Sequence, residues 1–295
     1  MTPEIQELLA ALEGEGYVAE PSIATALFLA RELKKPLLVE GDAGVGKTEL
    51  AKVLARLLST ELIRLQCYEG LDVQTALYEW DYPRQLIRLR LSEGRSEDSQ
   101  ELEARIFSRN YLLERPLLRA ITRQDRAAVL LIDEVDRADD GFEAFLLELL
   151  SDFQVTIPEL GTIRAEHTPH VLLTSNRTRE LGDALRRRCL YLYIEHPSLE
   201  KEVRIIRTRL PETREGLAGE VGRFLQALRA RELVKPPGVA ETLDWTQALL
   251  RLRQDSLEAG IVTQTLGCLL KDRHDLQAVT ASDVAALVTL AREAP

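Results

Sequence analysis

The sequence predicts an α/β fold, in which a parallel sheet flanked by helices is followed by a small all-helical domain. Three observations lead to this prediction. Strand-like and helix-like segments alternate as far as Pro197, only helical spacing follows it, and a glycine-rich loop separates the first strand from a helix. Alternating strands and helices are typical of a parallel sheet, and a later helical run is typical of a separate domain.

Runs of apolar residues place the strands. The clearest is "AAVLLIDE" (127–134), because a strand buried on both faces reads as a nearly continuous apolar run. Two β-rich pieces flank "PELG" (158–161), which predicts a hairpin with a four-residue turn over about 153–167. The other expected strands are 36–40, 61–67, 86–91, 170–176 and 190–197.

Helical spacing of apolar residues places the helices. In the first part of the chain we expect helices at 4–12, 22–33, 47–58, 73–80 and 142–150. The polar segment 93–100 is expected to be a surface loop. After Pro197 we expect helices at 198–209, 215–231, 239–253, 257–270 and 281–294. The predicted domains are therefore an α/β core over 1–197 and a helical domain over 198–295.

Composition excludes several classes of protein. The formal charge of −10 argues against a general nucleic-acid binder, whose contact surface is net basic. Three scattered cysteines are too few for a disulfide framework or a zinc cluster. No apolar run reaches the roughly 18 residues of a membrane span, and the first residues lack the pattern of a secretory signal. We therefore expect a cytoplasmic protein.

The segment "GDAGVGKT" fits the phosphate-loop pattern G-x-x-x-x-G-K-[ST] between a strand and a helix. Glycines allow successive backbone N–H groups to turn toward a phosphate, and the helix that begins at Lys47 adds its positive dipole end. Lys47 is expected to reach the β- and γ-phosphates of ATP, and the Thr48 hydroxyl to hold Mg²⁺. The residues expected around the nucleotide are Gly41, Asp42, Ala43, Gly44, Val45, Gly46, Lys47, Thr48 and Glu49.

A phosphate loop alone would also suit a small-molecule kinase, and two adjacent acids favour hydrolysis instead. Asp133 and Glu134 end the apolar strand 127–134, and ligands of an open α/β sheet bind at the carboxyl ends of its strands. We expect Asp133 to help hold Mg²⁺ and Glu134 either to accept a proton from the attacking water or to orient it. The alternative is an acidic turn that caps the next element.

Polar residues at the end of one further strand and before another complete the candidate site. Asn176 ends the strand 170–176, where its amide can bind the γ-phosphate and the water, although asparagine also serves commonly in turns. Three arginines, Arg186, Arg187 and Arg188, directly precede the strand 190–197. A run of arginines is usually a solvated surface, but an arginine beside a γ-phosphate raises the rate about 10³–10⁵-fold.

These motifs, in this order and spacing, resemble those of AAA+ ATPases. The resemblance implies that Arg188, and after it Arg187 and Arg186, completes the site of a neighbouring subunit. It therefore implies a homo-oligomeric ring, most often a hexamer. The core over 1–197 would be followed by a helical lid over 198–295.

The hairpin over about 153–167 is similar to the presensor hairpin of the MoxR group, and the segment over about 68–92 resembles the helix-2 insert of that group. The stretches "RLQCYEGLD", "YEWDYPRQL" and "ETLDW" resemble the CoxD-like members, which are associated with maturation of carbon monoxide dehydrogenase. This implies a remodelling ATPase that acts on a metalloenzyme precursor with a partner containing a von Willebrand factor A domain. Such partners would also bring the protein to the inner face of a membrane.

One position departs from the group's pattern. Val239 stands where an arginine, the second sensor, is expected at the start of a lid helix, and Lys235 lies nearby before two prolines. Either Lys235 substitutes for it, or the lid senses the γ-phosphate weakly.

Two other functions remain open at this stage. One is an ATP-binding switch or scaffold, and the other is a DNA-directed loader, which the acidic net charge disfavours. Cys67 is either a small buried apolar residue or a sulfur-handling group.

Overall fold

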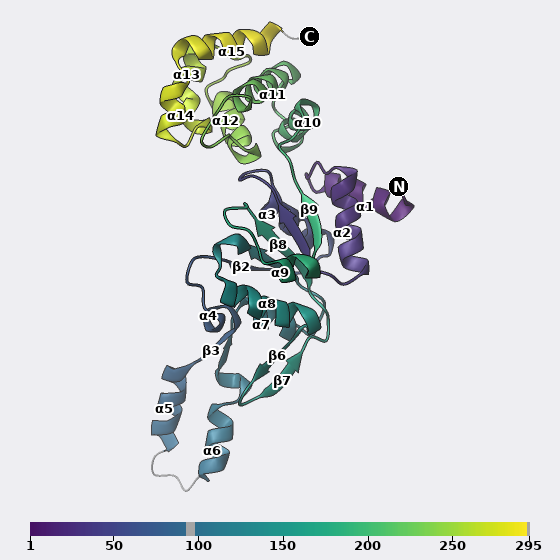
Figure 1. Cartoon of the computed structure of the whole chain (residues 1–295), viewed down its shortest axis with the longest axis vertical. Coiled ribbons are helices and arrows are strands. Elements are labelled where there is room, and N and C mark those ends of the chain that lie inside the picture. The colour runs from purple at the N-terminus through teal and green to yellow at the C-terminus, as the bar shows by residue number, and fades with distance from the viewer. Residues whose placement is uncertain (93–97, 294–295) are drawn as a thin grey trace. The chain divides into compact units, whose positions relative to one another are not determined.

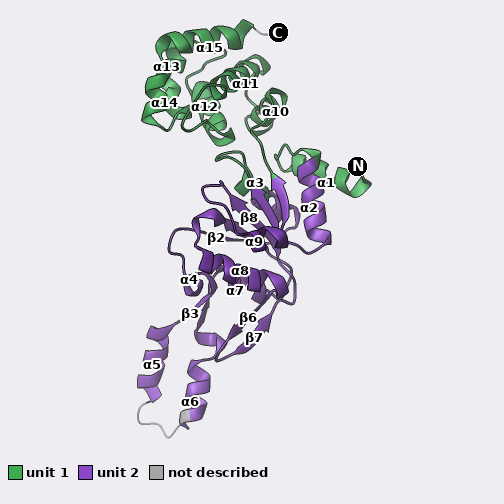
Figure 2. Cartoon of the chain, viewed as in Figure 1, with its two compact units in different colours: residues 1–21, 41–50, 193–295 green, residues 22–40, 51–192 purple. Residues whose placement is uncertain are grey.

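The computed structural model describes residues 1–92 and 98–293 (Figure 1). These residues divide into two compact units (Figure 2). Unit 1 comprises 1–21, 41–50 and 193–295, and unit 2 comprises 22–40 and 51–192. The chain thus passes between the units more than once, and the predicted domain boundary after residue 197 stays a prediction.

Unit 2 is built on a five-stranded sheet in the order β2-β5-β8-β1-β9. The pairs β2–β5, β5–β8 and β8–β1 are parallel. The central strands consist mostly of buried apolar residues, as expected for strands covered by helices on both faces. The five strands are β1 Leu37–Glu40, β2 Leu62–Gln66, β5 Val129–Asp133, β8 His170–Ser175 and β9 Leu190–Tyr193.

Helices and two small antiparallel sheets complete unit 2. The hairpin of β6 and β7 has buried Val155 and Ile163 alternating with exposed Thr156 and Thr162, which confirms the predicted hairpin. Its turn is shorter than predicted, because β7 begins at Gly161 and residues 158–160, not 158–161, connect the strands. The remaining elements are α2 Pro21–Glu32, α3 Lys47–Leu57, α4 Val73–Leu77, β3 Tyr78–Trp80, α5 Tyr82–Ser92, α6 Ser99–Ile106, η1 Arg109–Tyr111, β4 Leu112–Glu114, α7 Pro116–Thr122, η2 Val135–Arg137, α8 Asp140–Asp152, β6 Gln154–Ile157, β7 Gly161–Arg164 and α9 Asp183–Arg188. The first residues of α2 and α3 belong to unit 1.

The described part of unit 1 is helical after β9, as the sequence predicts. Its core surrounds Trp245, which packs against Phe224 with ring centroids 5.2 Å apart and donates a hydrogen bond to Thr265 Oγ1 (2.9 Å). Its helices are α1 Pro3–Gly14, α10 Leu199–Arg209, α11 Glu215–Arg229, α12 Val239–Arg251, α13 Ala259–Leu269, α14 Arg273–Ala278 and α15 Ala281–Glu293. The short helix α14 was not predicted. None of the described helices is long and apolar enough to cross a lipid bilayer.

The segment between β2 and β5 differs most from the prediction. The expected strand 86–91 is wrong, because this segment lies within helix α5. Its alternation of apolar residues and arginines imitates a strand, but Asp81 begins a helix by accepting hydrogen bonds from Arg84 N (3.1 Å) and, through its carbonyl, from Gln85 N (2.9 Å).

The expected helix 73–80 ends at Leu77, and Tyr78–Trp80 instead forms β3, which pairs with β4. Residues 93–97 of the expected loop 93–100 lie outside the described residues, and α6 begins at Ser99.

Two partly buried histidines predict a loss of stability in mild acid. The pKa of His170 is lowered mainly by burial and to a smaller extent by the positive charge of Arg31. The pKa of His196 is lowered in the same way, mainly by burial and then by the charge of Arg229. The unfolded chain therefore binds more protons than the folded chain as the pH falls below about 6.5. We expect the melting temperature to fall between about pH 7.5 and pH 5.5 and His170→Gln to reduce that fall. A melting temperature independent of pH over this interval would contradict the expectation.

Candidate active site

The sheet brings three strand ends together at its carboxyl edge. β8 lies between β5 and β1, so Asp133, Ser175 and Glu40 end neighbouring parallel strands. The chain from β1 crosses to the far strand β2 and later returns to β9 on the other side of β1. In open α/β sheets, ligands bind at such a reversal of strand order. The glycine-rich loop leaves the sheet at this point, directly after Glu40.

Glu134 has an unusual backbone conformation. Its φ of 53° and ψ of 49° lie in the left-handed region, which costs a residue other than glycine about 1–3 kcal/mol. Two hydrogen bonds hold this turn: Glu134 N donates to Thr174 Oγ1 (2.9 Å), and the Glu134 carbonyl accepts from Arg137 N (3.0 Å). Thr174 therefore fixes the direction in which Glu134 leaves the strand. Five other described non-glycine residues, among them Phe153 at the end of α8, also have positive φ, so this conformation sets the direction of the chain and does not by itself assign a function.

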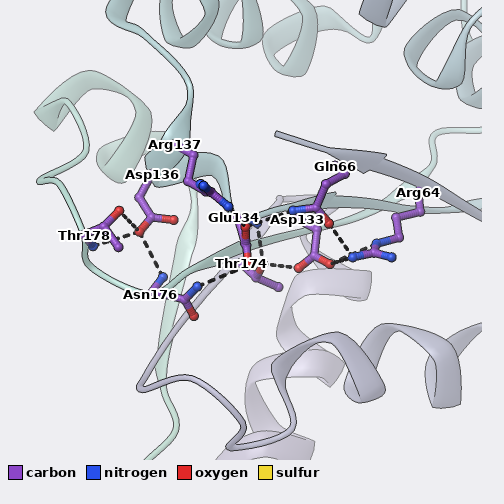
Figure 3. Close-up of polar contacts among 9 residues, drawn as sticks. All are labelled: Arg64, Gln66, Asp133, Glu134, Asp136, Arg137, Thr174, Asn176 and Thr178. Atoms are coloured by element: carbon purple, nitrogen blue, oxygen red, sulfur yellow. Dashed lines mark hydrogen bonds and ion pairs between the residues drawn. The ribbon is translucent and has the colours of Figure 1, made fainter. Parts of the chain in front are cut away.

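Polar groups from three elements meet the Glu134 carboxylate (Figure 3). Gln66 Nε2 donates to Oε2 from the end of β2 (3.0 Å), and Arg137 Nη1 donates to the same oxygen from η2 (3.0 Å). Asn176 Nδ2, after β8, lies 3.5 Å from Oε1, at the limit of a hydrogen bond. The structure thus brings the predicted Glu134 and Asn176 together. Because the contact to Oε1 is so long, Oε1 is the better placed of the two oxygens to accept a proton from water.

Asp133 is buried and uses both carboxylate oxygens. Thr174 Oγ1 donates to Oδ1 (2.5 Å), and Arg64 donates to Oδ2 through Nε (2.9 Å) and Nη2 (2.6 Å). An isolated buried carboxylate would be unstable, and these two partners satisfy it. Since the Arg64 side chain is half exposed, it can leave Asp133 toward solvent. A carboxylate oxygen is the kind of hard donor that Mg²⁺ prefers, so Asp133 fits the predicted role.

Asp136 holds the segment that carries Asn176. The buried Oδ2 of Asp136 accepts hydrogen bonds from Asn176 N (3.2 Å), Thr178 N (2.8 Å) and Thr178 Oγ1 (2.7 Å) (Figure 3). This fixes the chain directly after β8. The sequence signal was the third acid in "IDEVD", three residues after Asp133, which can also be interpreted as a solvated turn.

In unit 1, the backbone of the loop from Gly41 to Gly46 turns at its three glycines. Gly41, Gly44 and Gly46 all have positive φ, which glycine adopts at the least cost. The buried Lys47 ammonium donates to the carbonyl oxygens of Gly41 and Asp42, each at 2.6 Å. A phosphate oxygen can replace either carbonyl as a partner of the ammonium, so the loop fits the terminal phosphates of a nucleotide. That Lys47 and Thr48 act on the same nucleotide as Asp133 stays a prediction.

The start of α12 lies directly against this loop. Val239 N donates to Gly44 O (2.9 Å), and a Cβ added at Gly238 would stand 2.6 Å from the Gly44 Cα. Only glycine permits this approach of two backbones. Val239 therefore contributes a backbone N–H where an arginine side chain was expected. The exposed Lys235 is held through its own backbone N–H, which donates to Asp275 Oδ2 (2.9 Å).

We expect Gly238→Ala to separate α12 from the loop. The added methyl group would overlap Gly44, which we expect to destabilise the protein by about 1–3 kcal/mol and to weaken ATP binding roughly tenfold. Urea unfolding and titration with a fluorescent ATP analogue measure the two effects. The matched control is Gly260→Ala, where a Cβ meets no atom within 4 Å. Equal stability and affinity of the two variants would contradict this account.

The three arginines of α9 are all exposed but have different surroundings. Arg188 donates to Ser151 Oγ on α8, and the Arg186 guanidinium lies 5.8 Å from the centre of the Tyr191 ring. Tyr191 in turn donates to Glu40 Oε2 (2.9 Å) at the end of β1. None of the three arginines contacts Glu134 among the described residues. Their exposure is compatible with action on another subunit.

Cys67 follows β2 and is buried beneath this edge of the sheet. Burial, and to a smaller extent the charge of Asp133, raises the pKa of the Cys67 thiol to about 12. A thiol that stays protonated is a poor nucleophile and a poor metal ligand. The structure therefore favours the interpretation of Cys67 as a small apolar core residue.

Comparison with known proteins gives a family match. Residues 36–189 match the model of the AAA domain, dynein-related subfamily. The chaperone protein ClpB 2 of Parasynechococcus marenigrum is 32% identical over 168 residues, which cover 54% of this chain and 16% of that protein. The uncharacterized protein SAB1265c of Staphylococcus aureus is 26% identical over 180 residues, 59% of each chain. This chain thus spans less than two thirds of the length of either relative.

Two solved structures align over most of the chain. The Thermotoga maritima RuvB Holliday junction branch migration motor has 18% identity and a TM-score of 0.47, with 86% of this chain and 68% of that chain covered. A structure from Cytophaga hutchinsonii has 14% identity and a TM-score of 0.49, and the alignment covers 99% of this chain and 94% of that chain. Because both TM-scores are low, neither alignment adds to the assignment.

The family match begins at β1 and ends directly after Arg188. It therefore contains the glycine-rich loop, both acids, the asparagine and the three arginines, within just over half of the 295 residues. From this match and the parallel sheet that carries the motifs, we conclude that the chain belongs to the AAA domain family, in its dynein-related subfamily, and carries a P-loop ATPase domain.

Proposed function

We propose that the protein is an ATP-hydrolysing AAA+ chaperone of the MoxR type, which remodels a client protein. The observation that carries the proposal is the geometry of Glu134: a strained turn fixes its backbone, and Gln66 and Asn176 approach its carboxylate from two different strand ends. The convergence of these side chains on the carboxylate, rather than the backbone conformation alone, distinguishes Glu134 from a residue that only caps a turn.

The proposed reaction is attack of a water molecule on the γ-phosphate of ATP. The water oxygen forms a bond to phosphorus as the bond to the β-phosphate oxygen breaks, which gives ADP and phosphate. Glu134 accepts a proton from the water at Oε1, and the Asn176 amide orients the water and the γ-phosphate. Glu134 then releases its proton to solvent, since it lies at a partly exposed edge of the sheet.

Residues of the loop and the strand would hold the nucleotide. Lys47 exchanges its bonds to Gly41 O and Asp42 O for bonds to the β- and γ-phosphates, while the loop N–H groups surround the phosphate chain. Thr48 and Asp133 would hold Mg²⁺, which neutralises charge that develops on the phosphate oxygens. Asp133 becomes available as Arg64 turns outward to solvent.

An arginine of a second copy of the chain would complete the site. Arg188 is exposed at the end of α9 and is the first candidate, with Arg187 as the second. A guanidinium supplied by a neighbour stabilises charge on the transferring phosphoryl group, so turnover would require assembly. We therefore propose that copies of the chain assemble into a ring, with six subunits as the expected number because proteins with such an arginine most often form hexamers.

The proposed client is a metalloenzyme precursor during cofactor insertion, such as a molybdenum-containing carbon monoxide dehydrogenase. The CoxD-like stretches and the hairpin of β6 and β7 support this proposal, and the match to a protein named as a chaperone supports the wider class. A partner with a von Willebrand factor A domain would connect the ring to the client.

Co-expression with the dehydrogenase precursor tests the proposal. Wild-type protein is expected to raise carbon monoxide oxidation by the client, and the Glu134→Gln variant is expected to fail although it still binds ATP. Equal activation by both proteins would favour the alternative, an ATP-binding switch or scaffold in which turnover is incidental. No activation by either protein would remove this client.

A further inference from the structure

Helix α5 exposes four large apolar side chains. Tyr82, Leu86, Ile87 and Leu91 are each 59–63% exposed. Tyr82 and Leu86 are four residues apart, as are Ile87 and Leu91, so the four side chains form two adjacent rows along the helix. Single exposed apolar residues are ordinary on a protein surface, whereas four on one helix of eleven residues form a patch.

The same helix buries polar side chains. Gln85 is buried and donates to Ile106 O on α6 (2.7 Å), and the buried Ser92 donates to Leu89 O (2.8 Å). This is the reverse of an amphipathic surface helix, which buries its apolar face. The Ser92 bond lies within α5, whereas the bond of Gln85 to α6 connects the two helices and holds the apolar face outward.

A second pair of contacts fixes the rotation of α5 about its axis. Arg84 Nη1 donates to Asn110 O (2.9 Å), and the Arg84 guanidinium lies 5.2 Å from the centre of the Tyr111 ring. Rotating α5 to bury its leucines would break these bonds as well as that of Gln85. α5 and α6 lie at one end of unit 2, beyond β3 and the hairpin (Figures 1 and 2).

The charge of α5 indicates what covers this patch. The sequence "YPRQLIRLRLS" contains three arginines and no carboxylate, in a chain whose net charge is −10. Arg90 lies four residues after Leu86 and three after Ile87, so it stands among the apolar side chains. A complementary partner therefore carries carboxylates among apolar residues.

We propose that the exposed face of α5 is the docking surface for an acidic, amphipathic segment of a client protein. The inference rests on the proposed remodelling function and adds the segment that engages the client and the chemistry of what it engages. Tyrosine and arginine together are enriched at the centres of protein interfaces, where they contribute most of the binding energy.

A lipid surface fits this helix less well. Helices that lie on membranes keep basic residues on the polar face and leave the apolar face uncharged. On α5, Arg90 stands within the apolar face, and the opposite face is occupied by Gln85 and its contact to α6. This arrangement suits carboxylates of a protein partner.

Peptide binding tests the proposal. The probes are a fluorescein-labelled helical peptide with leucine on one face and glutamate on the other, and the same peptide with lysine in place of glutamate. Wild-type protein should bind the glutamate peptide and not the lysine peptide. Leu86→Ser and Arg90→Glu should each weaken that binding at least about tenfold, and Arg90→Glu should gain affinity for the lysine peptide.

The matched control is Leu33→Ser, an exposed leucine at the end of α2 that should leave binding unchanged. Three results would overturn the proposal. These are equal peptide binding by wild type and Leu86→Ser, binding to phosphatidylglycerol vesicles without binding to the peptide, and a change of oligomeric mass in Leu86→Ser, which would assign the patch to contacts between copies.

ATP turnover of the same variants separates this inference from the proposed function. Leu86 takes no part in the proposed chemistry, so Leu86→Ser should hydrolyse ATP at the wild-type basal rate. If the wild-type protein does not cleave ATP but binds the peptide through Leu86, the proposed ATPase function is rejected and the docking surface on α5 is retained. If Leu86→Ser hydrolyses ATP at the wild-type rate and also binds the peptide as well as wild type does, only the docking surface is rejected.

Discussion

The Glu134→Gln variant is expected to bind ATP normally and to hydrolyse it about 10²–10⁴ times more slowly than the wild type. The amide has the size of the carboxylate and can keep a hydrogen bond to Gln66 or Asn176, so the turn after β5 should stay intact. It cannot accept a proton from water at the pH of the reaction. Release of phosphate at saturating ATP measures turnover, and titration with a fluorescent ATP analogue measures binding.

Glu148→Gln is the control for this variant. Glu148 is an exposed acid on α8, outside the contacts of the candidate site, so its loss should change turnover little. If Glu134→Gln turned over ATP at the rate of Glu148→Gln, Glu134 would not be the base.

Arg188→Ala is expected to lower ATP turnover about 10³–10⁵-fold without weakening ATP binding. Among the described residues, Arg188 donates a hydrogen bond to Ser151 Oγ and makes no contact with the candidate site of its own chain. Its effect on binding in the same chain should therefore be small, whereas the neighbouring site would lose a positive charge at the γ-phosphate. Phosphate release by the assembled protein and analytical ultracentrifugation measure turnover and assembly separately.

The other two arginines provide the comparison. Arg187 is exposed, and we expect Arg187→Ala to have a much smaller effect than Arg188→Ala. Arg186 lies over Tyr191, so its removal is expected to disturb the contact of Tyr191 with Glu40 beside the loop. If Arg187→Ala strongly lowered ATP turnover while Arg188→Ala kept the wild-type rate, Arg187 rather than Arg188 would be the arginine that completes the neighbouring site.

The strands of the five-stranded sheet, the loop and the position of Glu134 could be predicted from sequence because each has a local signal. Long apolar runs mark β1, β5 and β8, and the acids stand where one of these runs ends. Parallel strands end at a common edge, so a list of strand ends already predicts Asp133, Glu134 and Asn176 as neighbours.

What could not be predicted depends on which strands pair. Arg64 and Gln66 reach Asp133 and Glu134 because β2 pairs with β5, and Thr174 reaches both acids because β8 lies on the other side. Nothing in the local sequence of "LIRLQ" indicates that its polar side chains belong to the site.

Helix α5 was missed for a different physical reason. It is not amphipathic in the usual sense, because polar contacts of Gln85 and Arg84 hold it while its leucines face solvent. A pattern search that assumes buried leucines therefore places no helix there.

In the proposed ring, one subunit supplies Glu134 and its neighbour supplies Arg188 to the same phosphate. Mixing the Glu134→Gln and Arg188→Ala proteins under conditions of verified subunit exchange tests this arrangement most directly. Each variant alone should be nearly inactive, and the mixture should regain activity, because an Arg188→Ala subunit keeps Glu134 and receives an arginine from its Glu134→Gln neighbour. A mixture as inactive as its parents, or an Arg188→Ala protein with wild-type turnover, would contradict the account.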